Sequence, residues 1–313
     1  MSRTRSVSIA RDSVVPSKHQ GKTSKTRWAE QIPAYLFLLP ALVLFGLFAW
    51  YPMINSVIMS FQSVKLNGED KFVGFDNYVR MFQNPNFGLS WLNSLQFALL
   101  SIVIGFIVPI AVAIGVNEMR RSKGFFRLVF FLPNLIPVVI YLLVWRLIYA
   151  SDGGFLNSFL GTFGVEPQLW LQNPATVKIA VVVILTWANF GGTMLIYLAA
   201  LGDLSPDLYE AAEIDGASIT QRIWHITVPY LRTTMKLLLV LQFLTVVQLF
   251  TEPFLLTSGG PANNTLTPVL SIYRIAFTDN DFGLASAWSV TLVIFLAIFS
   301  AIYLRLSRSE AGD

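Results

Sequence analysis

"EAAEIDGASITQRIWHITVP", residues 210–229, is a polar stretch that separates two long apolar runs. It contains three acidic residues, one glycine and a closing proline. The apolar runs, at 177–201 and 234–257, are each long enough for a helix to cross a bilayer, which needs roughly 20 apolar residues for a hydrocarbon core of about 30 Å. Two membrane-crossing helices joined by an ordered polar loop are therefore the starting hypothesis for the fold.

The composition of the whole chain supports a membrane protein. The chain has 313 residues, of which 54% are hydrophobic and 13% are charged, whereas soluble domains have about 25% charged residues. The mean hydropathy is +0.60. This amount of charge cannot cover a water-exposed surface. The absence of cysteine excludes disulfides, thiolate metal sites and cysteine nucleophiles.

Six apolar runs predict an all-α integral membrane protein with six transmembrane helices. The runs cover residues 34–61, 92–116, 127–149, 177–201, 234–257 and 283–306. Pro133, Pro137 and Pro253 lie inside or at the edge of these runs and are expected to bend helices. Outside the spans, we predict a disordered basic tail at 1–30 and a short C-terminal tail at 307–313.

The distribution of lysine and arginine predicts the orientation. An even number of spans places both termini on one side, and sixteen basic residues lie on that side against five on the other. Basic residues accumulate in cytoplasmic loops. Both termini and the 203–233 loop are therefore predicted to be cytoplasmic.

The loop itself is predicted to form two short helices joined by a turn. Ser205 is a good helix N-cap, and Pro206 fits the first helical position. Gly216 is expected to stop this helix and allow a sharp turn. A second helix follows, and Pro229 is expected to end it before the next span. Its apolar stripe consists of Ile219, Ile223 and Ile226.

The surface of the first predicted helix favours a protein partner. Ala211 and Ala212 are small enough to let another backbone come close, and Glu210 and Glu213 offer carboxylates to a basic partner. The alternative is an amphipathic helix lying on lipid headgroups. It is the weaker interpretation, because acids outnumber bases in this stretch and an anionic leaflet repels them.

The spacing of the loop resembles that of a known family. Glu210-Ala211-Ala212 is followed after three residues by Gly216, and after nine more by Ile226 and then Val228-Pro229. This pattern is similar to the EAA loop of the membrane subunits of binding-protein-dependent ABC importers; Val228 replaces the usual leucine. Between about residues 35 and 306, segments such as "FVGFDNYVRMF" and "FLLTSGGPANNT" resemble the carbohydrate-uptake branch.

The resemblance implies a type I ABC importer permease fold for 31–306, in which the 203–233 loop docks on a cytoplasmic ATPase subunit. Carried over by motif, the coupling residues are Glu210, Ala211, Ala212, Asp215, Gly216, Ile226 and Pro229. The implied partners are a second related permease, two copies of the ATPase, an extracytoplasmic substrate-binding protein and the lipid bilayer, without nucleic acid. The chain would carry no cofactor, because ATP and magnesium bind to the ATPase. The implied location is the cytoplasmic membrane of a bacterium or archaeon.

A sugar or related polyol, the substrate class of this branch, needs hydrogen-bonding groups within the spans. The candidate path residues are Trp187 and Asn189 in the fourth span and Gln242, Thr245 and Gln248 in the fifth. Glu252 extends the polar stripe of the fifth span. Hydrogen bonding between helices remains an alternative role for each of them. Asp279 and Asp281, on the outer side, either meet the binding protein or belong to a solvated loop.

Two other function classes are alternatives for this sequence. A stand-alone secondary carrier would use the stripe from Gln242 to Glu252 for ion coupling. An intramembrane enzyme would need a catalytic pair or metal ligands inside the spans. His19 and His225, the two histidines, lie outside them, and HExxH and GxSxG motifs are absent. We therefore predict neither catalytic nor metal-binding residues.

Overall fold

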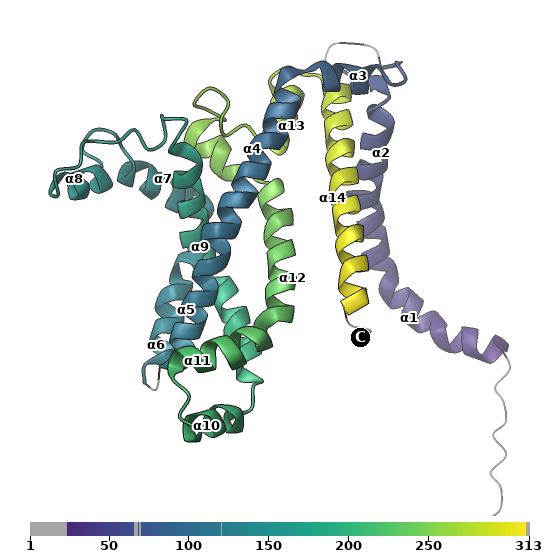
Figure 1. Ribbon diagram of the computed structural model, residues 1–313. Helices are drawn as coiled ribbons and strands as arrows, with labels where there is room; N and C mark the ends of the chain where they lie inside the picture. Colours follow the sequence, from purple (N-terminus) through teal and green to yellow (C-terminus); the bar gives the residue numbers. More distant parts are fainter. Residues whose placement is uncertain (1–23, 66–67, 69, 120, 311–313) are drawn as a thin grey trace, which may run out of the picture. The chain divides into compact units, whose positions relative to one another are not determined.

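The structure of the protein is a computed structural model that describes residues 24–65, 68, 70–119 and 121–310. The chain divides into two compact units, 1–54 and 55–313 (Figure 1). Most of the tail predicted at 1–30 lies outside the described residues. A helix begins at Ser24, inside that predicted tail, and the last helix continues to Glu310, beyond the predicted end of the spans.

The described part of the first unit is helical, and most of it is apolar. Helix α1, Ser24–Phe45, continues through the π-helical turn η1, Gly46–Trp50, into α2, Tyr51–Met59. Side chains from residue 35 to residue 45 are all exposed. A helix that is apolar on every side is stable only when another apolar phase surrounds it. This helix is long and apolar enough to cross a membrane, as the sequence predicts.

After the end of α2, the second unit contains a small hairpin and a helix that pack against the last helix. Strands β1, Gln62–Ser63, and β2, Lys71–Phe72, pair antiparallel, and α3, Asp76–Gln83, follows. Arg80 Nη2 lies 2.7 Å from Asp281 Oδ2, at the start of α14, Phe282–Glu310. Asp281 is buried by this ion pair. The prediction that Asp281 either faces a partner or belongs to a solvated loop is therefore wrong.

Three long helical segments form the centre of this unit. Helix α4, Pro85–Ser101, the π-helical turn η2, Ile102–Phe106, and α5, Ile107–Glu118, make one continuous span. It packs along α9, Val177–Gly202. The third segment is α12, Val228–Val247, which lies against α4 and α9. The second span is longer than the predicted 92–116 because Asn84 caps its start, accepting a hydrogen bond from Asn86 N at 2.9 Å.

The third predicted span is sharply broken. Helix α6, Lys123–Phe131, and the 3₁₀ turn η3, Leu132–Leu135, meet α7, Val138–Ile148, at an angle of 95°. Pro137 causes the break, because it lacks an N–H group and keeps the preceding residue in the extended conformation. Five helices are long and apolar enough to cross a membrane, and the described chain has six if this bent pair counts as one.

The fifth span also differs from its prediction. It begins at α11, Ile219–Arg222, and passes through the π-helical turn η4, Ile223–Thr227, into α12, which ends at Val247 rather than at residue 257. Pro229 does not end a helix. It lies in the first turn of α12, directly after the π-helical turn η4, and the helical span continues through it. The remaining elements are α8, Phe155–Gly161, α10, Pro206–Ile214, the π-helical turn η5, Pro253–Thr257, and α13, Pro268–Phe277.

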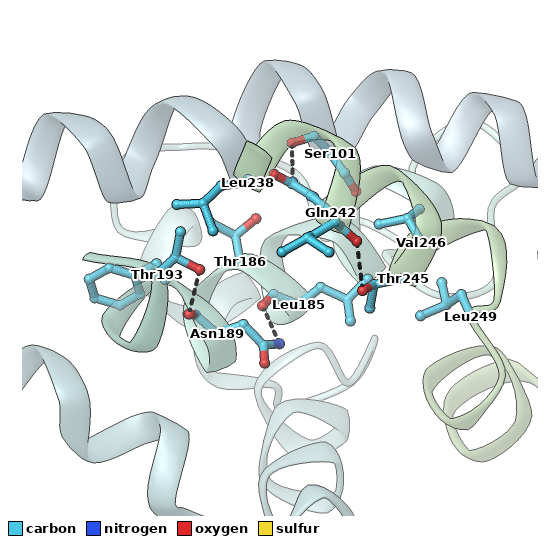
Figure 2. Close-up of a pocket in the computed structure, with 13 residues that line it drawn as sticks. Ser101, Leu185, Thr186, Asn189, Thr193, Leu238, Gln242, Thr245, Val246 and Leu249 are labelled. Carbon is cyan, nitrogen blue, oxygen red and sulfur yellow. Dashed lines mark hydrogen bonds between the residues drawn. The ribbon is translucent and has the colours of Figure 1, made fainter. Parts of the chain in front are cut away.

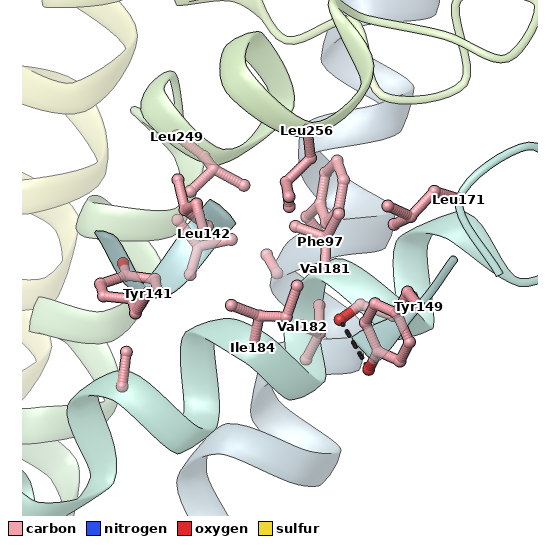
Figure 3. Close-up of a cluster of buried hydrophobic side chains, with 14 residues drawn as sticks. Phe97, Tyr141, Leu142, Tyr149, Leu171, Val181, Val182, Ile184, Leu249 and Leu256 are labelled. Carbon is pink, nitrogen blue, oxygen red and sulfur yellow. Dashed lines mark hydrogen bonds between the residues drawn. The ribbon is translucent and has the colours of Figure 1, made fainter. Parts of the chain in front are cut away.

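The apolar core lies around α9. Figure 3 shows one cluster, in which Phe97 of α4 and Leu142 of α7 meet Val181 and Ile184 of α9. A second cluster joins α5, α9 and α12 nearer to the loop of residues 203–233. Burial of these side chains fixes the rotation of α9, and this rotation decides which of its polar residues face α12.

Candidate functional site

A cavity of about 260 Å³ lies between α4 with η2, α9 and α12 (Figure 2). Three spans therefore contribute to its walls. Its thirteen lining residues are all uncharged. The polar or flexible members are Ser101, Gly105, Thr186, Asn189, Thr193, Gln242 and Thr245.

The structure brings three of the five predicted path residues together. Asn189, Gln242 and Thr245 line the cavity. Trp187 does not: its ring packs edge-on against Trp145, with centroids 5.6 Å apart, in the apolar core. Gln248 is exposed and donates a hydrogen bond to Leu244 O at 2.9 Å.

Glu252 is also separate from the cavity. Because α12 ends at Val247, the predicted stripe does not continue to this residue as a helix. Glu252 is buried and accepts a hydrogen bond of 3.2 Å from the hydroxyl of Tyr141. A buried carboxylate needs such a partner. The side chain therefore connects α7 to the segment that follows α12.

Gln242 is held by the second span. Its Nε2 donates to Ser101 O at 2.7 Å, one residue before the π-helical turn η2. A Cβ at Gly105 would lie 2.7 Å from the same nitrogen, so a larger residue there would displace this amide from its position. Sequence reasoning missed Ser101 and Gly105. The available signal was a serine and a glycine four residues apart within an aliphatic run, and π-turns occur often at functional sites.

The polar atoms that face the cavity are mainly acceptors. Asn189 Nδ2 donates to Leu185 O at 2.9 Å, and the hydroxyls of Thr186 and Thr245 donate to their own helices at 2.8 and 2.9 Å. Each of these groups uses one donor within the chain, and the amide nitrogens of Asn189 and Gln242 each keep a second N–H. The amide oxygens of Asn189 and Gln242 have no hydrogen-bond partner in the described part of the structure. The cavity is therefore suited to a solute that carries hydroxyl donors.

The loop of residues 203–233 has the predicted two helices. Ser205 caps α10, accepting a hydrogen bond from Asp207 N at 3.3 Å. Gly216 has a φ of +80°, which an L side chain rarely adopts, and it makes the turn. Ser218 and Gln221 form a reciprocal capping box at the start of α11. The N-cap and glycine-turn predictions are confirmed, although α11 continues into α12.

The predicted coupling residues divide by exposure. Glu210, Ala211, Asp215 and Gly216 are exposed, and Ala212, Ile226 and Pro229 are half-buried. Glu213 is not turned only toward solvent, because its Oε2 lies 3.5 Å from Arg222 Nη1. A cavity of about 890 Å³ separates α10 from the ends of α5 and α9. Sequence reasoning missed Arg222, which interacts with acids from two elements.

Comparisons with known proteins agree with this architecture. Residues 107–310 match the family described as "Binding-protein-dependent transport system inner membrane component". The probable ABC transporter permease protein YurN of Bacillus subtilis is 34% identical over 86% of this chain and 94% of its own length. The arabinooligosaccharides transport system permease protein AraP of the same organism is 32% identical, covering 91% of this chain and 92% of its own.

Among solved structures, a bacterial ABC transporter involved in the import of the acidic polysaccharide alginate contains a similar chain. The TM-score is 0.82 and the identity 26%, over 92% of this chain and 99% of that one. The family match covers more than half of the residues, and both named relatives are more than 30% identical over most of their length. The chain therefore belongs to the family of inner-membrane components of binding-protein-dependent transport systems.

Proposed function

We propose that this permease subunit forms part of the path for a neutral sugar or related polyol at the cavity of α4, α9 and α12, and that the 205–229 segment couples it to an ATPase. As a permease subunit of an ABC importer, the chain is not itself the ATPase and carries no cofactor; ATP is bound by the ATPase partner. This membership decides against a stand-alone secondary carrier and against an intramembrane enzyme.

The observation that carries the substrate proposal is the set of unpaired amide oxygens in an uncharged cavity. Asn189 and Gln242 present acceptors from two different helices, and sugar hydroxyls are donors. A solute carboxylate would meet no cation among the lining residues. The arabinooligosaccharide relative supports a saccharide. The alginate transporter is involved in the import of an acidic polysaccharide. Because the cavity of this chain has no charged lining residue, we do not extend an acidic substrate to it.

The coupling proposal uses the exposed face of α10. Glu210 and Ala211 are exposed beside each other at the end of the bundle, so a carboxylate and a small side chain are both accessible to another protein. The excess of basic residues on this side supports a cytoplasmic location for the loop and both termini. The proposed complex contains a second related permease, two ATPase copies and an extracytoplasmic binding protein.

The substrate proposal is tested by uptake into proteoliposomes that contain the complete transporter and its binding protein. The probes are radiolabelled maltose, trehalose, lactose and arabinooligosaccharides, with alginate oligosaccharides as the charged comparison. ATP-dependent uptake of a neutral saccharide is expected. Uptake confined to the charged oligosaccharides, or uptake that does not require ATP, would contradict the proposal.

Gln242→Leu is expected to impair uptake without affecting assembly. The leucine has a similar size but removes the amide oxygen that faces the cavity, and it leaves Ser101 O without its donor. Loss of one hydrogen bond to a neutral solute costs about 0.5–1.5 kcal/mol, so KM should rise about 2- to 12-fold. The measurement is uptake kinetics with co-purification of the other subunits. Gln248→Leu, on an exposed residue outside the cavity, is the matched control, and equal KM values for both variants would remove Gln242 from the path.

Gly216→Val is expected to distort the coupling loop and leave the spans intact. Valine at a φ of +80° is strained, at a cost of about 1–3 kcal/mol. Since Gly216 has open space around it, the strain comes from the backbone alone. The measurement is limited proteolysis within 203–233 together with ATPase co-purification. Gly202→Val, at a glycine with open space and no positive φ, is the control; unchanged cleavage and co-purification in Gly216→Val would refute the expectation.

A further inference from the structure

Helix α10 is attached to the bundle mainly through a few polar side chains. None of its residues is buried, and it is bounded by the connection at Asp203 and by the turn at Gly216. The hydroxyl of Tyr209 lies 2.6 Å from Thr227 Oγ1, and Glu213 lies beside Arg222. The position of α10 therefore depends on contacts with the segment that leads into α12.

Arg222 is the centre of these contacts. Its Nη2 lies 3.4 Å from Glu118 Oε2, and its Nη1 lies 3.5 Å from Glu213 Oε2. Its guanidinium carbon also lies 5.8 Å from the centre of the Tyr209 ring. The side chain of Arg222 is only 13% exposed, and its Nε is buried without a hydrogen-bond partner in the described structure. One planar cation thus joins two carboxylates that belong to different helices, which arginine does better than lysine.

The two carboxylates belong to the loop and to the wall of the cavity. Glu213 is on α10, whereas Glu118 is the last residue of α5. Helix α5 continues through η2 into α4 as one span, and this span supplies Ser101 and Gly105 to the cavity. Figure 1 shows α5 leading from the region of α10 and α11 toward α4. A displacement of α10 can therefore reach Gln242 through a continuous helix.

We propose that Arg222 is the positioning residue that makes α10 and α5 move together, so that docking of the ATPase changes the cavity. The proposal rests on the proposed coupling function of the loop. Arg222 acts through Glu118 and Glu213 and touches neither nucleotide nor solute. Without it, α10 still presents Glu210 to the ATPase, but its motion reaches the spans only through the connections at its ends and the Tyr209–Thr227 hydrogen bond.

The first test uses the complete transporter with Arg222→Gln, Glu118→Gln and the double variant. Arg222→Gln is expected to keep the ATPase bound and to lower the sugar transported per ATP hydrolysed about 10-fold, within the usual range of coupling between sites. Because Glu118 acts through its ion pair with Arg222, the double variant should transport as much sugar per ATP as Arg222→Gln alone. Arg222→Lys keeps the charge, so the sugar that it transports per ATP should lie between the values for Arg222→Gln and for the unchanged protein. Arg232→Gln, at an exposed arginine near the start of α12, is the matched control and should be unaffected.

The second test measures the motion directly. The chain has no cysteine, so Asp207→Cys on α10 and Ala111→Cys on α5 accept two spin labels at exposed positions. The distance between them should stay constant when ATP binds to the otherwise unchanged protein, and should change when Arg222→Gln is added. Normal transport per ATP in Arg222→Gln, loss of the ATPase from it, or the same label behaviour with and without Arg222 would each overturn the proposal. Failure of the coupling function itself would be seen separately, as retention of the ATPase by Glu210→Lys.

Discussion

Glu210→Lys is expected to abolish uptake and to release the ATPase. Glu210 is exposed on α10, next to alanines that leave its carboxylate accessible, and the proposed partner residue is basic. Removing one member of a charge pair at an interface costs about 2–5 kcal/mol, and a lysine adds repulsion to this loss. At about 1.4 kcal/mol for each tenfold change, the affinity for the ATPase should fall at least about 30-fold.

The measurement is co-purification of the ATPase from detergent-solubilised membranes, together with uptake in cells. Asp203→Lys is the control. Asp203 is an exposed acid that follows α9 and precedes α10. Its replacement by lysine therefore changes the charge by the same amount as Glu210→Lys, but outside the proposed docking surface. The control should retain the ATPase, and both variants should reach the membrane in normal amount. Retention of the ATPase and of uptake by Glu210→Lys would show that the loop docks elsewhere or not at all.

The caps and turn of this loop could be predicted from sequence because their causes are local. Ser205 accepts a hydrogen bond from a residue two positions away, and Gly216 adopts a conformation that few other residues tolerate. Pro229 shows the limit of such reasoning. Proline ends a helix when it lies in the interior and is tolerated in the first turn. At Pro229 the helix continues because the π-helical turn at Ile223–Thr227 comes directly before it. No local sequence pattern predicted that turn.

Hydropathy predicted which segments form the spans, but not where their helices bend or end. Pro137 indicated that the third span would bend, but the 95° angle is set by where α6 and α7 pack on α9. The same holds for α12, whose apolar pattern continues past Val247 although the helix does not. An apolar run shows that a segment lies in lipid or protein interior. It does not show where the hydrogen-bond pattern changes.

The cavity was predictable only in part, since it needs residues from three spans. The helical period placed Gln242 and Thr245 on one face of α12. It could not show that Trp187 would turn into the apolar core, because the rotation of α9 depends on its neighbours. Gly105 contributes through a contact with Gln242, 137 positions away in sequence, and Asp281 is buried by a partner 201 positions away. Without a map of contacts, neither role can be read from one helix.

Gly191→Ala is expected to cause the largest loss of stability of the single substitutions considered for the spans. Gly191 is buried in α9, and a Cβ there would collide with the carbonyl oxygen of Phe130 and with Phe131 Cα. Both atoms belong to the backbone of α6, so no side chain can move away. Overpacking usually costs about 1–3 kcal/mol, and a contact with backbone should reach or exceed the upper value. The result should be separation of α6 from α9.

The matched control is Gly115→Ala. Gly115 is also a glycine within a span, but it is exposed and nothing lies within 4 Å of a Cβ at this position. Alanine there removes the entropic cost of a helical glycine, so stability should change by less than about 1 kcal/mol. Thermal unfolding in detergent should show a large decrease in midpoint for Gly191→Ala and none for Gly115→Ala. Close helix packing through small residues is a main source of cohesion in membrane bundles, so equal midpoints would mean that α6 does not pack on α9 through Gly191.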